Sequence, residues 1–339
     1  MLIAVASVIA LATSAGIWVI VANDFAIHEE QVIVPGSAEP LHGVLALPPQ
    51  GKGPYGLVVF VHGDGPADAT RDSFYRPIWE SLAKAGYASL AWNKPGIDGA
   101  PGNWLNQSMH DRATEAEAAI TWARGRSDID PKRIGAWGIS QGGWVVPELA
   151  VRQPDMQFVI LVGAAVNWLR QGEYNLVAEM RNRNASAADI TTALDERKAK
   201  LKPLFAGATY EQYLASHADA EPMSADRWEF VKKNYRADIS ETLPKLRVPV
   251  LLELGEDDLN VDVHETERVY RALVRPDLLT VQMYPRASHS LARASLDNVH
   301  GIRTVLVATF APRSLYAPGY LDNLRHYVEQ TDSGKVKLG

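Results

Sequence analysis

The amino-acid sequence predicts an α/β fold, in which a mostly parallel, doubly wound sheet is covered by helices on both faces. Short apolar runs recur as continuous rather than alternating segments, which is typical of strands buried on both faces. Segments with helical periodicity separate these runs, and strands that alternate with helices form parallel sheets through right-handed crossovers. A third observation is that residues 163–247 contain no strand-like run, which predicts a helical insertion.

The composition fits a folded globular protein and excludes several classes of function. The chain has 339 residues, of which 47% are apolar and 22% charged, and it contains no cysteine. These values exclude a disordered or disulfide-stapled chain, thiolate metal sites and cysteine nucleophiles. The 34 basic and 40 acidic residues give a net charge of −6 without a basic cluster, so we expect no nucleic-acid partner.

The first element is an apolar run without a single charge at residues 2–22. As a helix it would be about 31 Å long, enough to cross a hydrocarbon core of roughly 30 Å. We therefore expect residues 1–23 to form a transmembrane anchor. A cleaved signal peptide is the alternative, because a stretch of small residues that ends at Ala15 could be a cleavage site. Cleavage there would leave an exposed apolar stub, and the segment lacks the basic start that is typical of signal peptides. A partner-binding or assembly helix is a third interpretation.

The flanks of this run give a weak indication of its orientation. The first lysine is Lys52 and the following flank is acidic, with Asp24, Glu29 and Glu30, so the positive-inside rule has little to compare. The simplest arrangement places residues 24–339 outside the cytoplasm, in the periplasm if the source is bacterial. If the segment is cleaved, the same domain would be secreted.

Eight apolar runs are the predicted strands of the domain at residues 24–339. The opening pair, residues 31–35 and 41–47, alternates between apolar and polar positions and is followed by a turn rich in Pro and Gly. The other runs are continuous. They span residues 56–61, 88–92, 133–138, 158–162, 248–254 and 278–284.

Three segments between the strands have helical periodicity. They span residues 72–85, 108–125 and 261–274. Asp72 and Ser108 are the expected N-caps of the first two, because their side-chain oxygens can accept from the free N–H groups of a first turn.

The strand-free segment is predicted to form a helical cap over the sheet at residues 167–246. It is rich in Ala, Glu, Arg and Lys, and Asn184, Ser186 and Ser224 stand at positions where helices could begin. A loop of that length without secondary structure would be unusual in a compact domain.

A motif that carries chemistry lies between a predicted strand and a helical segment, where residues 138–142 read Gly-Ile-Ser-Gln-Gly. Gly-x-Ser-x-Gly at such a junction is the pattern of a nucleophile elbow. The turn is tight, so side chains at Gly138 and Gly142 would collide with the neighbouring strand and helix. It exposes the Ser140 hydroxyl at a helix N-terminus, where the dipole favours developing negative charge. A plain tight turn is the structural alternative.

A serine hydroxyl is a poor nucleophile at neutral pH, so a base has to accompany it. The run at 248–254 is followed by three carboxylates, of which Asp258 is the candidate acid, and the run at 278–284 is followed by His289. All three groups therefore come directly after predicted strands. The chain order Ser140, Asp258, His289 predicts a catalytic triad.

A glycine-rich turn, His-Gly-Asp-Gly-Pro at residues 62–66, directly follows another predicted strand. Such a turn can aim a backbone N–H at the carbonyl oxygen of a bound substrate. We expect the N–H of Asp64, with Gly63 as the nearest competitor, to form an oxyanion hole with the N–H of Gln141. One such donor is typically worth about 10²–10³ in rate.

Other residues are weaker candidates. His264 opens a helix, and His300 lies too far from the last strand to serve as the base. No His-Glu-x-x-His or paired-carboxylate spacing suggests a metal, and no Gly-Lys-Ser/Thr follows the glycine-rich turn, so no metal or cofactor is expected. Trp144 and Trp168 are candidates to line the pocket, whereas most of the nine tryptophans are expected to be packed inside.

Taken together, these motifs resemble those of serine hydrolases of the α/β-hydrolase fold, specifically bacterial esterase-like members with a helical cap. The resemblance runs from about residue 32 to residue 328. Its most specific parts are residues 62–66, 137–144, 255–261 and 287–289. In that family the acid loop reads Gly-x-x-Asp-x-x-Val, which matches Asp258 rather than Asp257. Residues 93–96, Asn-Lys-Pro-Gly, depart from the family's Asp-Lys-Arg-Gly, which we expect to affect pocket shape more than mechanism.

The resemblance implies a serine hydrolase that cleaves the carboxylic ester bond of a small-molecule acyl ester, of any chain length, through an acyl-enzyme. Ser140 would attack the carbonyl, His289 would transfer the proton and Asp258 would hold the histidine in the right tautomer. The N–H groups of Asp64 and Gln141 would hold the oxyanion. A thioesterase or peptidase of the same fold is the main alternative, and a non-catalytic binding protein of this fold is another.

Overall fold

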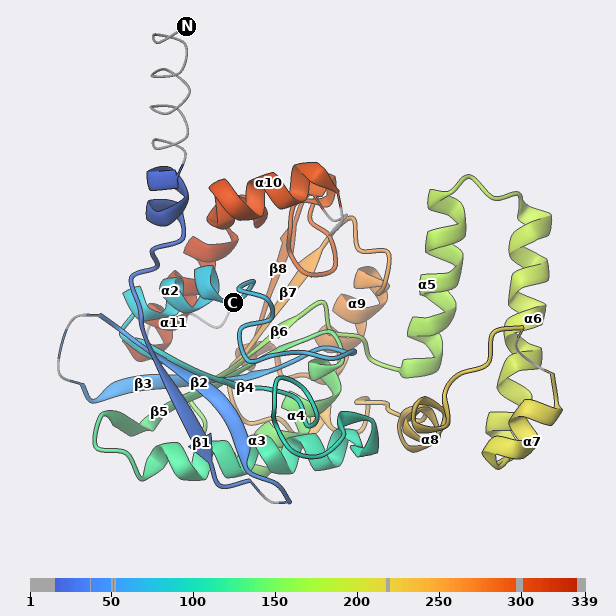
Figure 1. Ribbon diagram of the computed structural model, residues 1–339, viewed down its shortest axis with the longest axis horizontal. Helices are drawn as coiled ribbons and strands as arrows, with labels where there is room; N and C mark the ends of the chain where they lie inside the picture. The colour runs from blue at the N-terminus through green and yellow to red at the C-terminus, as the bar shows by residue number, and fades with distance from the viewer. Residues whose placement is uncertain are drawn as a thin grey trace, which may run out of the picture.

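An eight-stranded mixed sheet forms the centre of the protein in the computed structural model (Figure 1). The structure describes residues 16–36, 38–49, 51, 53–217, 220–296 and 301–333. The strands are ordered β1-β2-β4-β3-β5-β6-β7-β8. The β1–β2 and β2–β4 pairs are antiparallel and the other pairs are parallel. The predicted mostly parallel α/β sheet is therefore confirmed.

Each strand lies close to one of the eight predicted apolar runs. The strands are β1 (His28–Val34), β2 (Leu41–Leu47), β3 (Tyr55–Val61), β4 (Tyr87–Trp92), β5 (Ile129–Ile139), β6 (Phe158–Val162), β7 (Val250–Gly255) and β8 (Leu279–Tyr284). The central strands β3, β4, β6 and β7 are buried almost throughout. This burial is the reason why their sequences are continuous apolar runs.

Helices cover both faces of the sheet (Figure 1). Outside the cap they are α2 (Arg76–Lys84), α3 (Met109–Arg124), α4 (Gly142–Arg152), α9 (Val263–Leu273), α10 (Ile302–Phe310) and α11 (Tyr320–Asp332). Short 3-10 turns are η1 (Trp104–Asn106), η2 (Leu243–Lys245), η3 (Pro276–Leu278), η4 (Ala294–Leu296) and η5 (Pro312–Leu315).

Two apolar cores lie on opposite faces of the sheet, and β3 contributes to both. Leu57 and Val59 belong to the core to which α3, α4 and α9 contribute, whereas Val58 and Phe60 belong to the core to which α2 and α11 contribute. This alternation follows from the two-residue period of a strand. The sheet is thus held rigidly from both sides, and its carboxyl edge offers fixed positions for functional groups.

The cap segment, residues 167–246, contains four α-helices between β6 and β7. They are α5 (Trp168–Asn182), α6 (Ala187–Phe205), α7 (Tyr210–Ala215) and α8 (Ala225–Asn234). Ser186 and Ser224 are N-caps, as expected, because their side chains accept from the N–H groups of Asp189 and Arg227. Asn184 has a φ of 58° and lies in the turn before α6, so its expected role as a helix start is wrong.

One helix start outside the cap also differs from the prediction. Ser108 caps α3 through a capping box with Asp111, as expected. Asp72 is not an N-cap, because α2 begins only at Arg76. Arg71, Asp72 and Ser73 have φ values of 52°, 52° and 71°, and a left-handed backbone cannot continue into a right-handed helix.

The predicted membrane segment, residues 2–22, lies outside the described residues except for residues 16–22, which are helical. Within the described ranges, none of the helices combines the length and the apolar character that a membrane crossing requires.

Candidate active site

The Ser140 turn joins β5 to α4 at the carboxyl edge of the sheet. Ser140 has a φ of 53°, a conformation that costs a non-glycine residue energy and that clusters at functional sites. A Cβ on Gly138 would lie 2.7 Å from Cγ2 of Val146, and one on Gly142 would lie 2.6 Å from the carbonyl oxygen of Val61. Glycine at these two positions therefore lets strand and helix approach closely enough to form the elbow.

His289 and Asp258 are hydrogen-bonded in loops that follow β8 and β7. Nδ1 of His289 lies 2.8 Å from Oδ2 of Asp258. The other carboxylate oxygen accepts from the N–H groups of Asn260 (2.7 Å) and Val261 (2.9 Å). Asp258 is buried, whereas its neighbour Asp257 is exposed, so only Asp258 is placed to orient the histidine.

Gly163, directly after β6, lies against the backbone and the ring of His289. Its φ is 53°, and a Cβ there would lie 2.6 Å from the carbonyl oxygen and 2.9 Å from Nδ1 of His289. Gly163 was not among the site residues predicted from the sequence. The signal that was present is a glycine at the end of a predicted strand, at the same edge of the sheet as Ser140.

The glycine-rich turn at residues 62–66 lies against Ser140. A Cβ on Gly63 would be 3.2 Å from Cβ and 3.7 Å from Oγ of Ser140. Within the described chain, the backbone N–H groups of Gly63, Asp64 and Gln141 form no hydrogen bond. These donors are therefore available to a substrate oxygen beside Ser140, as an oxyanion hole requires.

Two buried basic residues, Lys94 and Arg112, hold this turn in place. Nζ of Lys94 donates to the carbonyl oxygens of Gly63 (2.6 Å) and Gly65 (2.7 Å). Burial, reinforced by the charge of Arg112, lowers the pKa of Lys94 well below its usual value. The departure from the family pattern at residues 93–96 leaves Lys94 unchanged, and its ammonium group contacts the turn directly.

Arg112 of α3 joins the same turn to the elbow. Its guanidinium donates to the carbonyl oxygen of His62 and to Oε1 of Gln141, both at 2.6 Å. Arg112 is buried, and burial lowers its pKa although the charge of Glu115 opposes this. Arg112 was not predicted as a site residue, because the local sequence of a helical segment does not show which distant residues an arginine contacts.

His62 is a structural residue of the turn. Its Nε2 lies 2.6 Å from the carbonyl oxygen of Trp92, and its Nδ1 lies 3.1 Å from the Tyr75 hydroxyl. Burial, together with the charge of Lys94, lowers its pKa to about 3. The ring is therefore neutral, with Nε2–H donating to the carbonyl. His264 is exposed on α9, and His300 lies outside the described residues.

An ion pair connects the turn to the cap. The guanidinium of Arg227 in α8 donates to both carboxylate oxygens of Asp64, at 2.6 and 3.0 Å. Nε2 of Gln141 donates to the same carboxylate at 3.2 Å. Burial favours the protonated acid, but the hydrogen bond and charge of Arg227 outweigh it and lower the pKa of Asp64. The carboxylate is thus ionised at neutral pH.

A cavity of about 970 Å³ brings most of the predicted site residues together. Ser140, Gln141, His289, Asp64 and Gly63 line it, and Asp258 lies buried behind the histidine. Apolar side chains dominate the rest of its wall. They include Phe25, Phe74, Ile139, Trp144, Trp168, Val261, Leu296, Val305 and Leu315. The two tryptophans expected to line the pocket, one from α4 and one from the cap, therefore do so.

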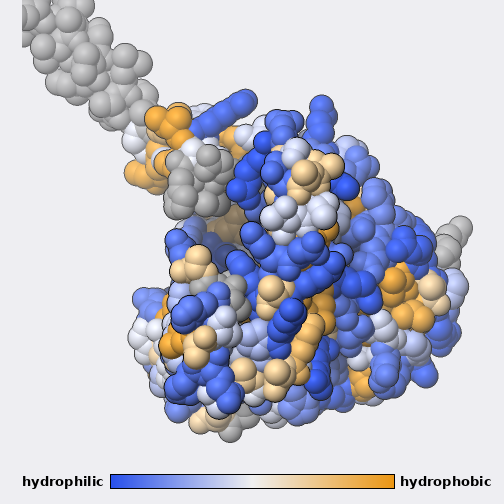
Figure 2. Space-filling view, turned by 90° about the vertical axis from the view of Figure 1, so that its right-hand side faces the viewer, coloured by the Kyte–Doolittle hydropathy of each residue, from blue (hydrophilic) through white to orange (hydrophobic). Residues whose placement is uncertain are grey.

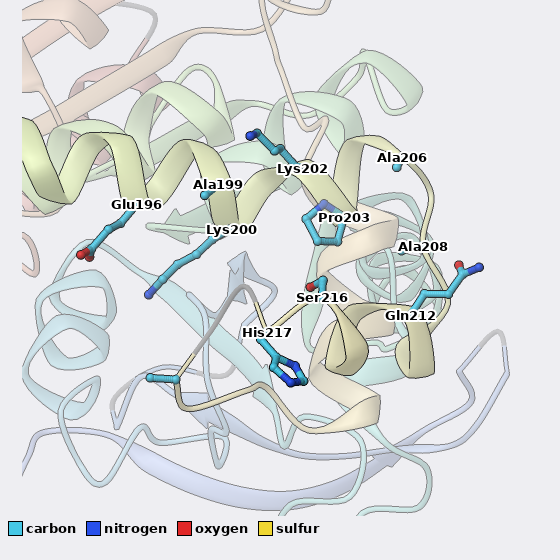
Figure 3. A pocket seen from close by; sticks show the side chains of 11 residues that line it. Glu196, Ala199, Lys200, Lys202, Pro203, Ala206, Ala208, Gln212, Ser216 and His217 are labelled. Atoms are coloured by element: carbon cyan, nitrogen blue, oxygen red, sulfur yellow. The ribbon is translucent and has the colours of Figure 1, made fainter.

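A second hollow of about 880 Å³ lies within the cap, between α6 and α7 (Figure 3). Its wall includes Glu196, Lys200, Ser216 and His217, which come from the cap alone. Ser140 is not part of this wall, so the hollow is separate from the predicted triad.

Strand order, the strained serine turn and a histidine after the last strand define an α/β hydrolase. Residues 52–294 match the family described as serine aminopeptidase, S33, and the chain belongs to this family. The match covers most of the sheet, the cap and the three predicted triad residues. The resemblance to serine hydrolases of the α/β-hydrolase fold is thereby confirmed at the level of family and fold.

Known structures and sequences of several activities are similar to this chain. A proline iminopeptidase of Mycobacterium smegmatis has a TM-score of 0.57 at 17% identity, over 90% of this chain and 99% of its own. An esterase of Pyrococcus furiosus has a TM-score of 0.56 at 16% identity, over 91% of each chain. At such identities the likeness concerns the fold.

Among curated sequences, the acylamino-acid-releasing enzyme of Arabidopsis thaliana is 27% identical over 250 residues. That match covers 71% of this chain and 28% of the plant enzyme. The chain covers between 28% and 36% of the length of the curated relatives it matches.

Proposed function

We propose that the protein is a serine hydrolase that cleaves carboxylic ester bonds through an acyl-enzyme on Ser140. One observation carries the proposal. Ser140 and His289 line the same cavity, and Nδ1 of His289 is 2.8 Å from Oδ2 of the buried Asp258. A nucleophile at an elbow and a histidine oriented by a buried carboxylate are the parts that acyl transfer requires.

In the proposed reaction, Oγ of Ser140 attacks the ester carbonyl while Nε2 of His289 takes the hydroxyl proton. His289 then gives this proton to the alcohol oxygen as the carbon–oxygen bond breaks, and the alcohol leaves. Water deacylates the enzyme by the same steps, losing one proton to His289, which returns it to Ser140. Asp258 accepts from Nδ1–H throughout and stabilises the imidazolium.

The N–H groups of Asp64 and Gln141 are the proposed oxyanion donors. They stabilise the charge that develops on the carbonyl oxygen in the transition state. Lys94 and Arg112 hold the turn by donating hydrogen bonds to its carbonyl oxygens. Arg112 also holds the elbow, because it donates to the side-chain oxygen of Gln141. These donors are therefore already positioned before substrate binds.

The charges of the cavity favour an ester over a peptide with a free amino end. A protonated amine requires an anionic partner in the pocket. Among the described residues that line the cavity, the carboxylates are Asp64 and Asp72. Asp64 is already paired with Arg227, and Asp72 is exposed. The largely apolar wall is better suited to an uncharged acyl chain.

The test is turnover of p-nitrophenyl esters from acetyl to palmitoyl, compared with aminoacyl p-nitroanilides and acyl thioesters. We expect ester hydrolysis that falls by at least about 10³-fold in Ser140→Ala. Ser290→Ala is the matched control, because Ser290 lines the same cavity and should be dispensable. Faster turnover of anilides or thioesters would favour the peptidase or thioesterase. Neither turnover nor fluorophosphonate labelling of Ser140 would favour a binding protein.

Membrane attachment through residues 2–22, with the hydrolase domain outside the cytoplasm, is part of the same proposal. It is supported by the uncharged run in the sequence. The alternative remains secretion after signal cleavage. Fractionation of cells that express the full chain separates the two: an anchored protein resists carbonate and is released by detergent, whereas a cleaved one begins after residue 15 and is recovered in the soluble fraction.

A further inference from the structure

Exposed apolar side chains gather on one face of the protein. Ten large hydrophobic residues are strongly exposed in the described part of the chain, and seven of them lie in two short segments. These seven residues, here called the apolar rim, are Ile17, Trp18, Ile20 and Val21 of residues 16–22 and Ile302, Val305 and Leu306 of α10. Monomeric soluble proteins rarely group exposed apolar residues in this way unless the patch binds a partner.

The two segments of the apolar rim are fixed to each other. Nε1 of Trp18 donates to the carbonyl oxygen of Phe310, and Nδ2 of Asn23 donates to that of Thr309, both at 2.8 Å. Arg313 donates to the carbonyl oxygens of Ala22 (2.7 Å) and Asp24 (3.0 Å). Residues 16–22 and α10 therefore lie on the same side of the molecule, as Figure 1 also shows.

No element in the described chain covers the outer face of α10. The helix has no buried residue, and Arg303 is its single charged one. Ile302 at one end is 79% exposed. A helix this apolar normally packs into a core, so its exposed face indicates a surface that is covered in the protein's working environment.

The chain itself indicates which partner covers it. Residues 2–15, which precede the apolar rim in sequence, carry no charge. Figure 2 shows hydrophobic residues gathered on this part of the surface. If this uncharged run inserts into a bilayer, α10 would lie at the bilayer surface, because Trp18 and Asn23 join the N-terminal segment to α10. Tryptophan is enriched at such interfaces.

The inner side of α10 faces the active-site cavity. Thr304, Val305 and Ala308 line the same cavity as Ser140, together with Phe25 at the end of the N-terminal segment. Val305 is at once a cavity wall and 50% exposed. The apolar rim therefore borders the cavity in which the proposed ester cleavage takes place.

We propose that the apolar rim rests on a lipid bilayer, and that the cavity takes up esters with long acyl chains from this bilayer past α10. The choice of substrate rests on the proposed function, but the binding of the rim to lipid does not. An acyl chain that moves from the bilayer to the apolar cavity wall stays out of water, whereas entry from solution would expose it.

The binding test uses the full chain. Because the chain contains no cysteine, an environment-sensitive fluorophore can be attached to a single introduced cysteine. The variant Leu306→Cys is compared with Leu214→Cys in α7, which is similarly exposed. On vesicles of phosphatidylcholine and phosphatidylglycerol, we expect a blue shift and quenching by spin-labelled lipid at position 306 only. Vesicle-bound protein without quenching at position 306 overturns the proposal. So does a blue shift that depends on protein concentration without lipid, because a second copy would then cover the rim.

The substrate test uses a double variant of the rim that carries both Ile302→Glu and Leu306→Glu. Its matched control is a double variant that carries both Ile33→Glu and Leu214→Glu. Neither pair lines the active-site cavity. We expect the rim variant to lose at least about tenfold of its turnover of a long-chain ester held in vesicles. Its turnover of p-nitrophenyl acetate should stay within about twofold of the wild type. Equal loss on both esters, or an equal loss in the control, overturns the proposed substrate route. Absence of all ester turnover with quenching at position 306 would contradict the proposed function alone.

Discussion

Gly163 leaves no space for a larger residue beside His289. A Cβ at this position would meet the carbonyl oxygen and Nδ1 of the histidine at 2.6 and 2.9 Å. The histidine loop would have to shift, and with it the hydrogen bond to Asp258. Small displacements of a catalytic base are costly, because proton transfer depends on short and aligned hydrogen bonds.

We therefore predict that Gly163→Ala lowers kcat by about 10²-fold while the protein remains folded. Gly207→Ala is the matched control, because Gly207 also has a positive φ, of 68°, but has no atom within 4 Å of the added Cβ. Both variants carry the same kind of backbone strain, roughly 1–2 kcal/mol. Kinetics with a short ester and urea unfolding separate the two effects. Equal loss of kcat in both variants would contradict a specific contact with the histidine.

Glu253 on β7 is a buried acid that the proposed mechanism does not use. Its Oε1 accepts from the Tyr284 hydroxyl at 3.0 Å, and Oε2 has no hydrogen-bond partner within the described residues. Burial raises the pKa of Glu253 from 4.5 to about 8, although the bond from Tyr284 opposes the shift. The folded protein therefore keeps the proton up to about pH 8, whereas the unfolded chain loses it above about pH 4.5.

Because the folded-state pKa is raised, this contribution to stability is complete below pH 4.5 and is lost as pH rises towards 8. Glu253→Gln, which does not titrate, should therefore gain stability relative to the wild type over this range. The expected slope is at most about 1.4 kcal/mol per pH unit. Urea unfolding at pH 5, 6.5 and 8 measures it, with the exposed Glu256→Gln as control. Parallel curves for Glu253→Gln and the wild type would contradict the neutral state of the buried acid.

At the scale of elements, α8 of the cap is attached to the oxyanion turn by Arg227 and Asp64. The pair is half-exposed, so it contributes less than about 1 kcal/mol to folding. Its effect on activity is expected to be larger, since the same turn carries the Asp64 N–H beside Ser140. Loss of the pair removes the ionic contact between α8 of the cap and the oxyanion turn.

We predict that Arg227→Ala lowers kcat about tenfold, with a change of less than about 1 kcal/mol in the free energy of unfolding. Arg183→Ala removes another ion pair of the cap, with Glu179, which does not involve a residue of the turn. It should leave kcat unchanged. Measurement of kcat for a short ester, beside urea unfolding, checks both. Unchanged kcat in Arg227→Ala would show that the cap and the turn act independently.

The sequence predicted some elements well and others poorly, for physical reasons. Six of the eight strands were predicted because strands buried on both faces are continuous apolar runs. The opening pair, β1 and β2, was predicted from the alternation of apolar and polar residues. The start of α2 was wrong, since three successive residues with positive φ leave no clear mark in the sequence. The exposure of α10 was not foreseen either. An apolar helix has the same sequence pattern whether it packs into a core or lies on the surface.

At the scale of the whole molecule, the candidate site was predictable where its residues lie at strand ends. Ser140, Asp258 and His289 each follow a strand, and parallel strands bring their carboxyl ends to one edge. Lys94, Arg112 and Arg227 were missed or left without this role. Their contacts join segments far apart in the chain, such as Arg227 and Asp64, 163 residues apart. No local pattern encodes such contacts.

The central claim is that Ser140 becomes acylated and that the fold positions His289 and Asp258 to drive this step. The most direct test is rapid quenching with p-nitrophenyl acetate, followed by mass spectrometry of the peptides. In the wild type we expect one added acetyl group, on Ser140, that forms and disappears at rates consistent with turnover. Ser140→Ala should carry none, and His289→Ala should acylate far more slowly. Ester turnover without an acetyl group on Ser140, or with the group on another residue, would contradict the account.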